Sequence, residues 1–266
     1  MIRRLHELLG YRINAVNGEI GAVNDFYFDD HQWTVRYVVI DTGPWLFGRR
    51  LLVATDAIES IESLSEVVNV NLTKEQVEHS PDLDLARPFT REQEIELHDY
   101  YGWPGYWTAL PLAGVPALAP PTRIPVGPTG SASAAYSAAE GEDAVLPSAA
   151  DHRLLEPNLR SLNDVRGYYL AATDGDIGHV ADFFAGENDW IIRYMEVDTR
   201  NWLPGKHVLI GIDWVTAVNW AERKVQVKVK RQQVQESPEY DPQATLDRAY
   251  ESRLHEHYFF PTYWGV

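Results

Sequence analysis

Cysteine is absent from this chain of 266 residues, which excludes disulfides, thiolate metal ligands and thiol nucleophiles. Long apolar runs are also lacking. No window approaches the roughly 18 apolar residues of a membrane-spanning helix, and the basic start MIRRLHELLG is not followed by the apolar run of a signal peptide. We therefore expect a cytoplasmic protein with no membrane span.

Basic residues are scarce, with 23 Lys and Arg against 39 Asp and Glu, and the formal net charge is −16. Such a charge repels phosphate groups, so nucleic acid is disfavoured as a partner. One basic stripe departs from this trend, because Lys224, Lys228 and Lys230 alternate with valines. We interpret these lysines as protection of an exposed sheet edge, with a contact to RNA or to an acidic partner as the alternative.

Motifs of common enzyme classes are missing as well. The sequence holds no Gly-rich phosphate loop, no nucleophile elbow and no His-rich metal string. Asp25 with Asp182, or Asp56 with Asp213, are conceivable pairs for acid–base chemistry, but carboxylates in the turns of an acidic protein are expected anyway. We predict a protein that is not an enzyme and that carries no cofactor and no metal.

What the sequence does contain is an internal repeat. Residues 33–48, WTVRYVVIDTGPWLFG, reappear as residues 190–205, WIIRYMEVDTRNWLPG, at an offset of 157 (190 − 33) that needs no gap. The same offset relates both ends of the chain, so residues 1–109 form one repeat and residues 158–266 a second. Residues 110–157 are rich in Ala, Pro, Gly and Ser, which is typical of a flexible linker.

Short β-rich runs alternate with turn residues inside each repeat. Asn17-Gly18 and Asp174-Gly175 suit tight hairpin turns, and strands are expected at residues 19–28, 33–40, 51–53, 57–61 and 67–72. A helix is expected at residues 90–101, with a counterpart at 244–258, and each precedes an aromatic tail. We predict a mainly β fold of two small antiparallel β-barrels related by approximate twofold symmetry. Each barrel carries a short helix and an aromatic tail that packs across the two copies.

The repeated segment is dense in residues suited to recognition. Our candidate structural or recognition cluster comprises Trp33, Arg36, Asp41 and Trp45 in the first repeat, and Trp190, Arg193, Asp198 and Trp202 in the second. Each Arg and Asp could form an ion pair or bind an anion, but we favour hydrogen bonds that fix the turn. For the tryptophans we favour packing within the protein over stacking on a ligand. The loop tip differs between the copies, Gly43-Pro44 against Arg200-Asn201, and is therefore the expected place for recognition.

Two Glu/His pairs on the predicted helices provide the most specific hypothesis for a metal site. Glu94 and His98 are four residues apart and recur as Glu251 and His255, so two related helices could bring four ligands together. A Glu/His pair at this spacing is also an ordinary contact on a helix surface. We favour the interpretation without a metal.

These motifs resemble those of the PRC-barrel family, in particular its bacterial members with two such domains in tandem. The resemblance rests on the D/N-G-x-I-G turns at residues 17–21 and 174–178, on Asp25-Phe26 and Asp182-Phe183, and on the R-Y and D-T-x-x-W-L-x-G strings. It implies a small β-barrel like that of the photosynthetic reaction-centre H subunit and of the ribosome maturation factor. Those relatives bind other proteins, and the family has no general catalytic residue set.

The resemblance and the missing motifs lead to two functional hypotheses. We expect a non-enzymatic protein-binding or scaffold module, built as a covalent pseudo-dimer and acting on a protein partner. The alternative is a small-molecule or metal-binding regulatory protein with a site between the two repeats. A deep polar pocket between the repeats favours the alternative, whereas a dry apolar interface favours the first.

Overall fold

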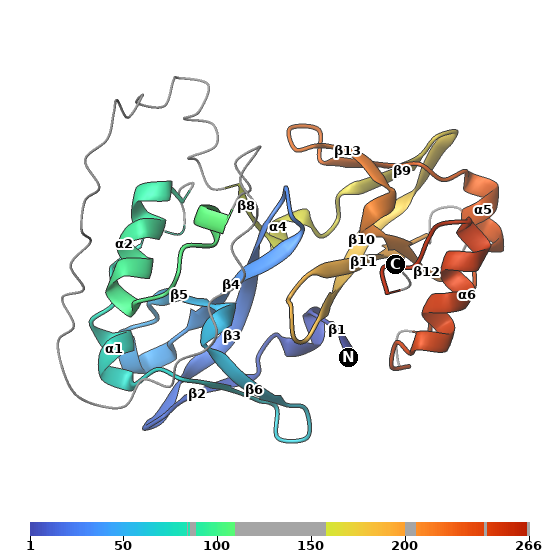
Figure 1. The fold of residues 1–266 in the computed structure, drawn as a ribbon. Helices are drawn as coiled ribbons and strands as arrows, with labels where there is room; N and C mark the ends of the chain where they lie inside the picture. The colour runs from blue at the N-terminus through green and yellow to red at the C-terminus, as the bar shows by residue number, and fades with distance from the viewer. Residues whose placement is uncertain (84, 86–88, 110–157, 200–205, 242–243, 265–266) are drawn as a thin grey trace, which may run out of the picture.

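The computed structural model describes residues 1–83, 85, 89–109, 158–199, 206–241 and 244–264 (Figure 1). The predicted linker at residues 110–157 and the candidate Trp202 lie outside the described residues. The fold is mainly β and consists of two sheets of mixed strands. No helix in the described part of the chain is long and apolar enough to cross a membrane.

The two repeats form sheets with the same strand order. In the first repeat the order is β5-β4-β3-β2-β7-β6. The strands are β2 (Arg12–Ala15), β3 (Gly18–Asp29), β4 (Thr34–Asp41), β5 (Arg50–Ala54), β6 (Ile58–Glu62) and β7 (Val67–Val70). The second repeat has the order β12-β11-β10-β9-β14-β13. Its strands are β9 (Tyr169–Ala172), β10 (Gly175–Gly186), β11 (Ile192–Asp198), β12 (His207–Gly211), β13 (Val215–Asn219) and β14 (Lys224–Val227).

Neither sheet closes into a hydrogen-bonded ring, and neither is wholly antiparallel, which differs from the predicted antiparallel barrels. β2 pairs with β7 and β9 with β14 in parallel. The turns η3 (Thr55–Ala57) and η5 (Ile212–Trp214) bend the chain without reversing it, so β6 continues in the direction of β5 and β13 in that of β12. The next strand therefore returns parallel to the first strand of its repeat.

Lys224 lies on β14, which is not an edge strand, and Lys228 and Lys230 follow the end of that strand. β14 is paired with β13 on one side and with β9 on the other. The interpretation that Lys224, Lys228 and Lys230 protect a sheet edge is therefore wrong. It fails because the parallel β9–β14 pair joins strands that are distant in sequence, and an alternating pattern does not reveal such a pair.

Each repeat donates one strand to the sheet of the other. β1 (Ile2–Arg4) pairs with β10, and β8 (Leu159–Ser161) pairs with β3. These two pairings are equivalent under the offset of 157 (159 − 2). Thr34 forms a β-bridge with Ile191, the residue at its own equivalent position, as a twofold axis requires. The repeats are thus joined by a reciprocal strand exchange.

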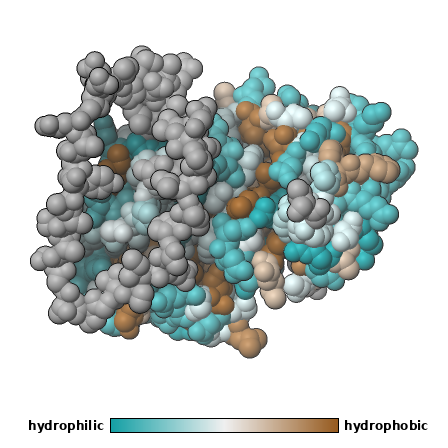
Figure 2. Space-filling view, viewed as in Figure 1, coloured by the Kyte–Doolittle hydropathy of each residue, from teal (hydrophilic) through white to brown (hydrophobic). Residues whose placement is uncertain are grey.

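A continuous apolar core extends through both repeats. At the junction Phe28 lies 6.0 Å from Phe183 and 5.3 Å from Trp33, measured between ring centres. Trp190 of the second repeat lies 6.2 Å from Phe26 of the first. Burial of each large aromatic side chain contributes about 2–3 kcal/mol. Hydrophobic residues also gather near the middle of the molecular surface (Figure 2).

Each repeat ends in a helix, and the two helices lie at opposite ends of the molecule (Figure 1). α2 (Arg91–Tyr101) begins after Thr90, which forms a capping box, and α6 (Arg248–Tyr258) begins after the capping residue Asp247. The start of α6 therefore falls later than the predicted residue 244. The shorter helical segments are η1 (His6–Leu8), η2 (Gly43–Leu46), α1 (Lys74–Glu78), η4 (Tyr106–Ala109), α4 (Leu162–Val165) and α5 (Arg231–Glu236).

The aromatic tails turn back onto their own repeats, which differs from the predicted packing across the copies. Gly102 and Phe259 adopt the left-handed conformation directly after α2 and α6. The next backbone N–H then donates to a carbonyl of the same helix, at 2.9 Å for Trp103 and 3.1 Å for Phe260. The left-handed cap therefore directs each tail toward its own helix.

Gly21 and Gly178 occupy positions where no side chain fits. A Cβ atom would lie 2.2 Å from the Asp41 carbonyl oxygen at Gly21 and 2.1 Å from the Asp198 carbonyl oxygen at Gly178. We expect Gly21→Ala to lower the free energy of unfolding by about 3 kcal/mol or more, measured by denaturant titration. Gly10→Ala is the control, because Gly10 has a φ of +84° but no atom within 4 Å of an added Cβ. We expect it to cost only about 1 kcal/mol, and equal losses in both variants would contradict the steric explanation.

Candidate functional site

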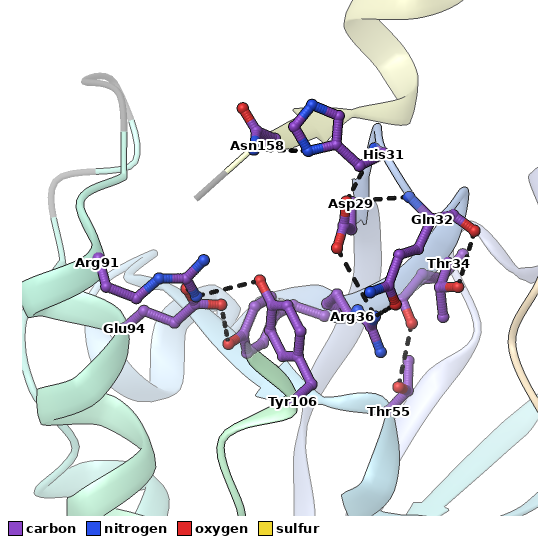
Figure 3. Close-up of polar contacts among 12 residues, drawn as sticks. Asp29, His31, Gln32, Thr34, Arg36, Thr55, Arg91, Glu94, Tyr106 and Asn158 are labelled. Carbon is purple, nitrogen blue, oxygen red and sulfur yellow. Dashed lines mark hydrogen bonds and ion pairs between the residues drawn. The ribbon is translucent and has the colours of Figure 1, made fainter. Parts of the chain in front are cut away.

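The two arginines of the candidate cluster pack against the aromatic tails. The Arg36 guanidinium lies 4.0 Å from the centre of the Tyr106 ring and 3.7 Å from an Asp29 carboxylate oxygen (Figure 3). In the second repeat, Arg193 lies 4.3 Å from the centre of the Tyr263 ring. A cation–π contact at such a partly exposed position contributes about 0.5–1 kcal/mol. Each arginine therefore joins its strand to the tail of its own repeat.

The two aspartates lie at the other end of the same strands. Asp41 accepts a hydrogen bond from the backbone N–H of Gly43 at 2.9 Å, so it pins the turn that follows β4. Five residues of extended strand span about 16 Å, which is too far for a direct contact. Arg36 and Asp41 consequently do not form the hypothesised pair. Asp198 lies at the equivalent end of β11.

The tryptophans lie in different parts of the molecule. Trp33 and Trp190 meet at the junction, where their carbonyls accept backbone hydrogen bonds from the other repeat at 2.7 and 2.9 Å. Trp45 lies in η2, with the Lys74 ammonium 4.5 Å from the centre of its ring. Trp202 is outside the described residues. The described members of the candidate cluster thus do not converge on one binding site.

A buried cluster of Tyr37, Glu94 and His98 joins α2 to the first sheet. The Tyr37 hydroxyl lies 2.6 Å from both Glu94 Oε1 and His98 Nε2. Arg91 pairs with the Glu94 carboxylate (Figure 3). All three side chains of the cluster belong to residues that are at most 5% exposed, and burial raises the pKa of Glu94 and lowers the pKa of His98. The cluster is closed to a substrate and holds the helix on the sheet.

The second repeat contains the equivalent cluster of Tyr194, Glu251 and His255. The Tyr194 hydroxyl lies 2.9 Å from His255 Nε2, and Tyr263 donates to Glu251 at 3.0 Å. Burial again raises the pKa of the glutamate and lowers the pKa of the histidine. Because the two helices lie at opposite ends of the molecule (Figure 1), the Glu/His pairs do not meet, and the four-ligand metal hypothesis is wrong.

Two of the four aspartates considered for acid–base chemistry, Asp25 and Asp182, hold the exchanged segments instead. Asp25 accepts a hydrogen bond from the Ser161 hydroxyl on β8. Asp182 accepts from the backbone N–H of His6 at 3.2 Å and pairs with Arg4 on β1 at 2.8 Å. Burial raises the pKa of Asp25, and it raises the pKa of Asp182 to about 6. Each carboxylate is engaged by the incoming strand of the other repeat.

One buried ion-pair cluster occurs in the second sheet and has no counterpart in the first. Glu196 on β11 is 0% exposed and pairs with Arg4 at 2.6 Å and with His207 at 2.7 Å. The residue equivalent to Glu196 in the first repeat is Val39. Our sequence reasoning missed this cluster because it looked for agreement between the repeats. A buried strand that carries a charge in one copy and a valine in the other is the signal that reveals it.

A cavity of about 290 Å³ lies beside this ion-pair cluster, between the repeats. Arg3, Arg4 and Ser63 line it from the first repeat, and Phe184 and Tyr240 line it from the second. Arg4 belongs both to the cavity wall and to the buried ion pairs, so a bound molecule would contact a fixed charge network. The volume is near the lower end of the range of small-molecule pockets, about 300–1,000 Å³.

Comparison with known families identifies the class of the first repeat. Residues 2–77 match the family model of the PRC-barrel domain, so this chain carries a PRC-barrel domain. The matched segment runs from β1 into α1 and includes all six strands of the first repeat's own sheet. No curated protein matches the chain.

His98 and His255 generate a prediction about pH dependence. Burial lowers both of their pKa values in the folded chain, whereas histidine in an unfolded chain has a pKa of about 6.5. The unfolded state thus binds more protons below that pH, so these residues lower the free energy of unfolding as the pH falls from about 7 to 5. We expect the double variant His98→Gln, His255→Gln to show a flatter dependence over this range, measured by urea titration at each pH.

The control for this experiment is His31→Gln, which changes an exposed histidine. We expect this variant to keep the slope of the wild type. A double variant whose slope equals that of the wild type would show that the buried histidines do not set the pH dependence.

Proposed function

We propose that this chain is a non-enzymatic protein-binding or scaffold module that acts on a protein partner in the cytoplasm. In this proposal it is a covalent pseudo-dimer of two PRC-barrel units. The family match of residues 2–77 supports the assignment of the first unit, and the identical strand order of the second sheet supports the same class for the second unit.

The observation that carries the proposal is the reciprocal exchange of β1 and β8. Because each sheet is extended by a strand from the other repeat, the units cannot separate without breaking backbone hydrogen bonds in both sheets. The junction is filled by aromatic side chains such as Phe28 and Phe183. The molecule therefore acts as one rigid frame that presents two related surfaces at a fixed separation, as a scaffold requires.

The arrangement of the titratable residues also favours binding over catalysis. The Tyr/Glu/His clusters beneath α2 and α6 are closed to solvent, and Asp25 and Asp182 are engaged by the exchanged strands. A catalytic group must come within hydrogen-bond reach of a substrate. These four groups of side chains hold the fold together instead.

The loop after β4 is the recognition segment in this proposal. It follows Asp41 and contains the tip Gly43-Pro44, which differs in the second repeat. Phe47 in this loop is 100% exposed and has a φ of 56°. Exposing a whole aromatic ring in the left-handed conformation does not stabilise the free protein, so a bound partner is the natural role for this side chain.

Photo-crosslinking tests the proposal directly. We expect p-benzoylphenylalanine placed at position 47 to capture a specific protein in the native cell. Phe47→Ala should weaken association with that protein on the order of tenfold, because the loss of an aromatic anchor typically costs 1–2 kcal/mol. Its free energy of unfolding should remain that of the wild type, since the ring makes no buried contact.

The matched control carries the same crosslinker at position 259. Phe259 is 88% exposed and also left-handed, but it follows α6 in the second repeat. Capture at position 47 and not at 259 supports recognition by the loop. No specific product at either position would count against the protein-binding function.

The cavity between the repeats supports a second candidate function, a small-molecule or metal-binding regulatory protein. Its wall combines Arg3 and Arg4 with the aromatic rings of Phe184 and Tyr240, so a small molecule with a polar and an aromatic part fits its chemistry. The aromatic part of the junction, around Phe28 and Phe183, is apolar, which favours the first candidate. The cavity lies at the edge of that junction and is compatible with both.

Ser63→Trp tests the cavity with little risk to the fold. The equivalent residue in the second repeat is Trp220, whose ring packs 4.3 Å from Arg160, the equivalent of Arg3. We expect native mass spectrometry of the wild-type protein purified from cells to retain a small ligand if this function holds. The Ser63→Trp variant should lose the ligand with an unchanged unfolding temperature. A wild type without added mass, also after incubation with divalent metals, would remove this candidate.

A further inference from the structure

Two sheet edges in the described part of the molecule are exposed. Each sheet has two end strands. The end strand β5 of the first sheet and the end strand β12 of the second are buried along nearly their whole length. The end strands β6 and β13 differ from these in that the middle of each strand is exposed, and among the described strands each pairs on one side, with β7 or β14. An exposed strand edge offers unpaired backbone groups to another strand.

The chain segments that contain the two exposed edges differ in charge. The β6–β7 hairpin, residues 58–70, contains Glu59, Glu62 and Glu66 and no lysine or arginine. In the second repeat β13 itself carries no charge, but its hairpin partner and the residues that follow are basic. These basic residues are Arg223, Lys224, Lys228 and Lys230; the turn before β14 also holds Glu222, and Lys224 pairs with Asp176 at 3.0 Å. The equivalent hairpins of a duplicated fold have thus become electrostatically complementary.

The hairpins also lie on opposite sides of the molecule. In Figure 1, β6 leads to the loop at the bottom of the view and β13 leads to the loop at the top. A contact between β6 of one copy and β13 of another leaves a free β6 and a free β13 at the two ends of the pair. Such a heterologous contact continues to add copies until the rotation closes a ring.

We propose that copies of this chain associate head to tail, with the acidic edge strand β6 of one copy beside the uncharged edge strand β13 of the next. Strands in a sheet lie about 4.8 Å apart, so Lys224 on β14 would lie about 10 Å from the incoming strand, and the exposed Lys228 and Lys230 continue from the end of β14. Their flexible side chains bring the ammonium groups closer to Glu59 and Glu62. A β6–β6 contact would instead place these carboxylates opposite one another, which is unfavourable.

This self-association is separate from the proposed function, because it uses the strand edges and not the loop around Phe47. The charges favour a second copy of this chain as the partner, because each copy carries one acidic strand and one basic hairpin. Salt screens such contacts over a Debye length of about 8 Å at physiological ionic strength. Association should therefore weaken as salt is raised.

Sedimentation velocity of the full chain at low salt, over a wide concentration range, tests this inference. We expect the wild-type mass to rise above 30.2 kDa with concentration, and the apparent affinity to fall on the order of tenfold or more at high salt. The acidic-edge variant Glu59→Lys, Glu62→Lys and the basic-hairpin variant Lys228→Glu, Lys230→Glu should each remain monomeric. All four positions are exposed, so both variants should fold.

Mixing the two variants supplies the decisive control. Each then meets a partner with the opposite charge at both edges, so the equimolar mixture should assemble although neither variant does so alone. This rescue also shows that both variants are folded. A wild type that stays at 30.2 kDa at every concentration, or an assembly unchanged by either charge reversal, would overturn the proposal.

Discussion

The backbone hydrogen bonds that join β1 to β10 and β8 to β3 are the constraint on which the rest of the structure depends. They bring residues 2–4 to the second sheet and residues 159–161 to the first. Asp182 and Asp25 bind these segments, and the aromatic junction lies between the two sheets that the exchange joins. Loop-closure entropy grows only slowly with chain length. The long separation between the exchanged strands is therefore a small obstacle to this arrangement.

Much of the fold could be predicted because equivalent positions of the two repeats serve the same structural role. The turns at Asn17-Gly18 and Asp174-Gly175 do connect β2 to β3 and β9 to β10. Sheet closure and tail packing could not be predicted in the same way. They depend on the bend at η3 and on the left-handed caps at Gly102 and Phe259, each set by the conformation of a few residues. Such local conformations leave no periodic pattern in the sequence.

The candidate site shows a different limit of sequence reasoning. Arg36 and Asp41 are close in sequence, but an extended strand holds them about 16 Å apart. Arg4 and Glu196 are 192 residues apart and form a direct ion pair at 2.6 Å. Agreement between the repeats identifies residues such as Gly21 and Trp33 that maintain the frame. The ion-pair cluster could be found only through a disagreement, Glu196 against Val39.

Fusion of the two units explains why such disagreements are possible. In a dimer of identical chains every substitution appears on both sides of the axis, so a buried Glu196 would need two sets of partners, and an acidic edge would always occur twice. A covalent duplication keeps the apolar junction common to both halves while each half changes its other surfaces independently. Glu66 and its counterpart Arg223 have diverged to opposite charge in this way. Positions at which the two halves differ are therefore where we place the proposed recognition and self-association of this chain.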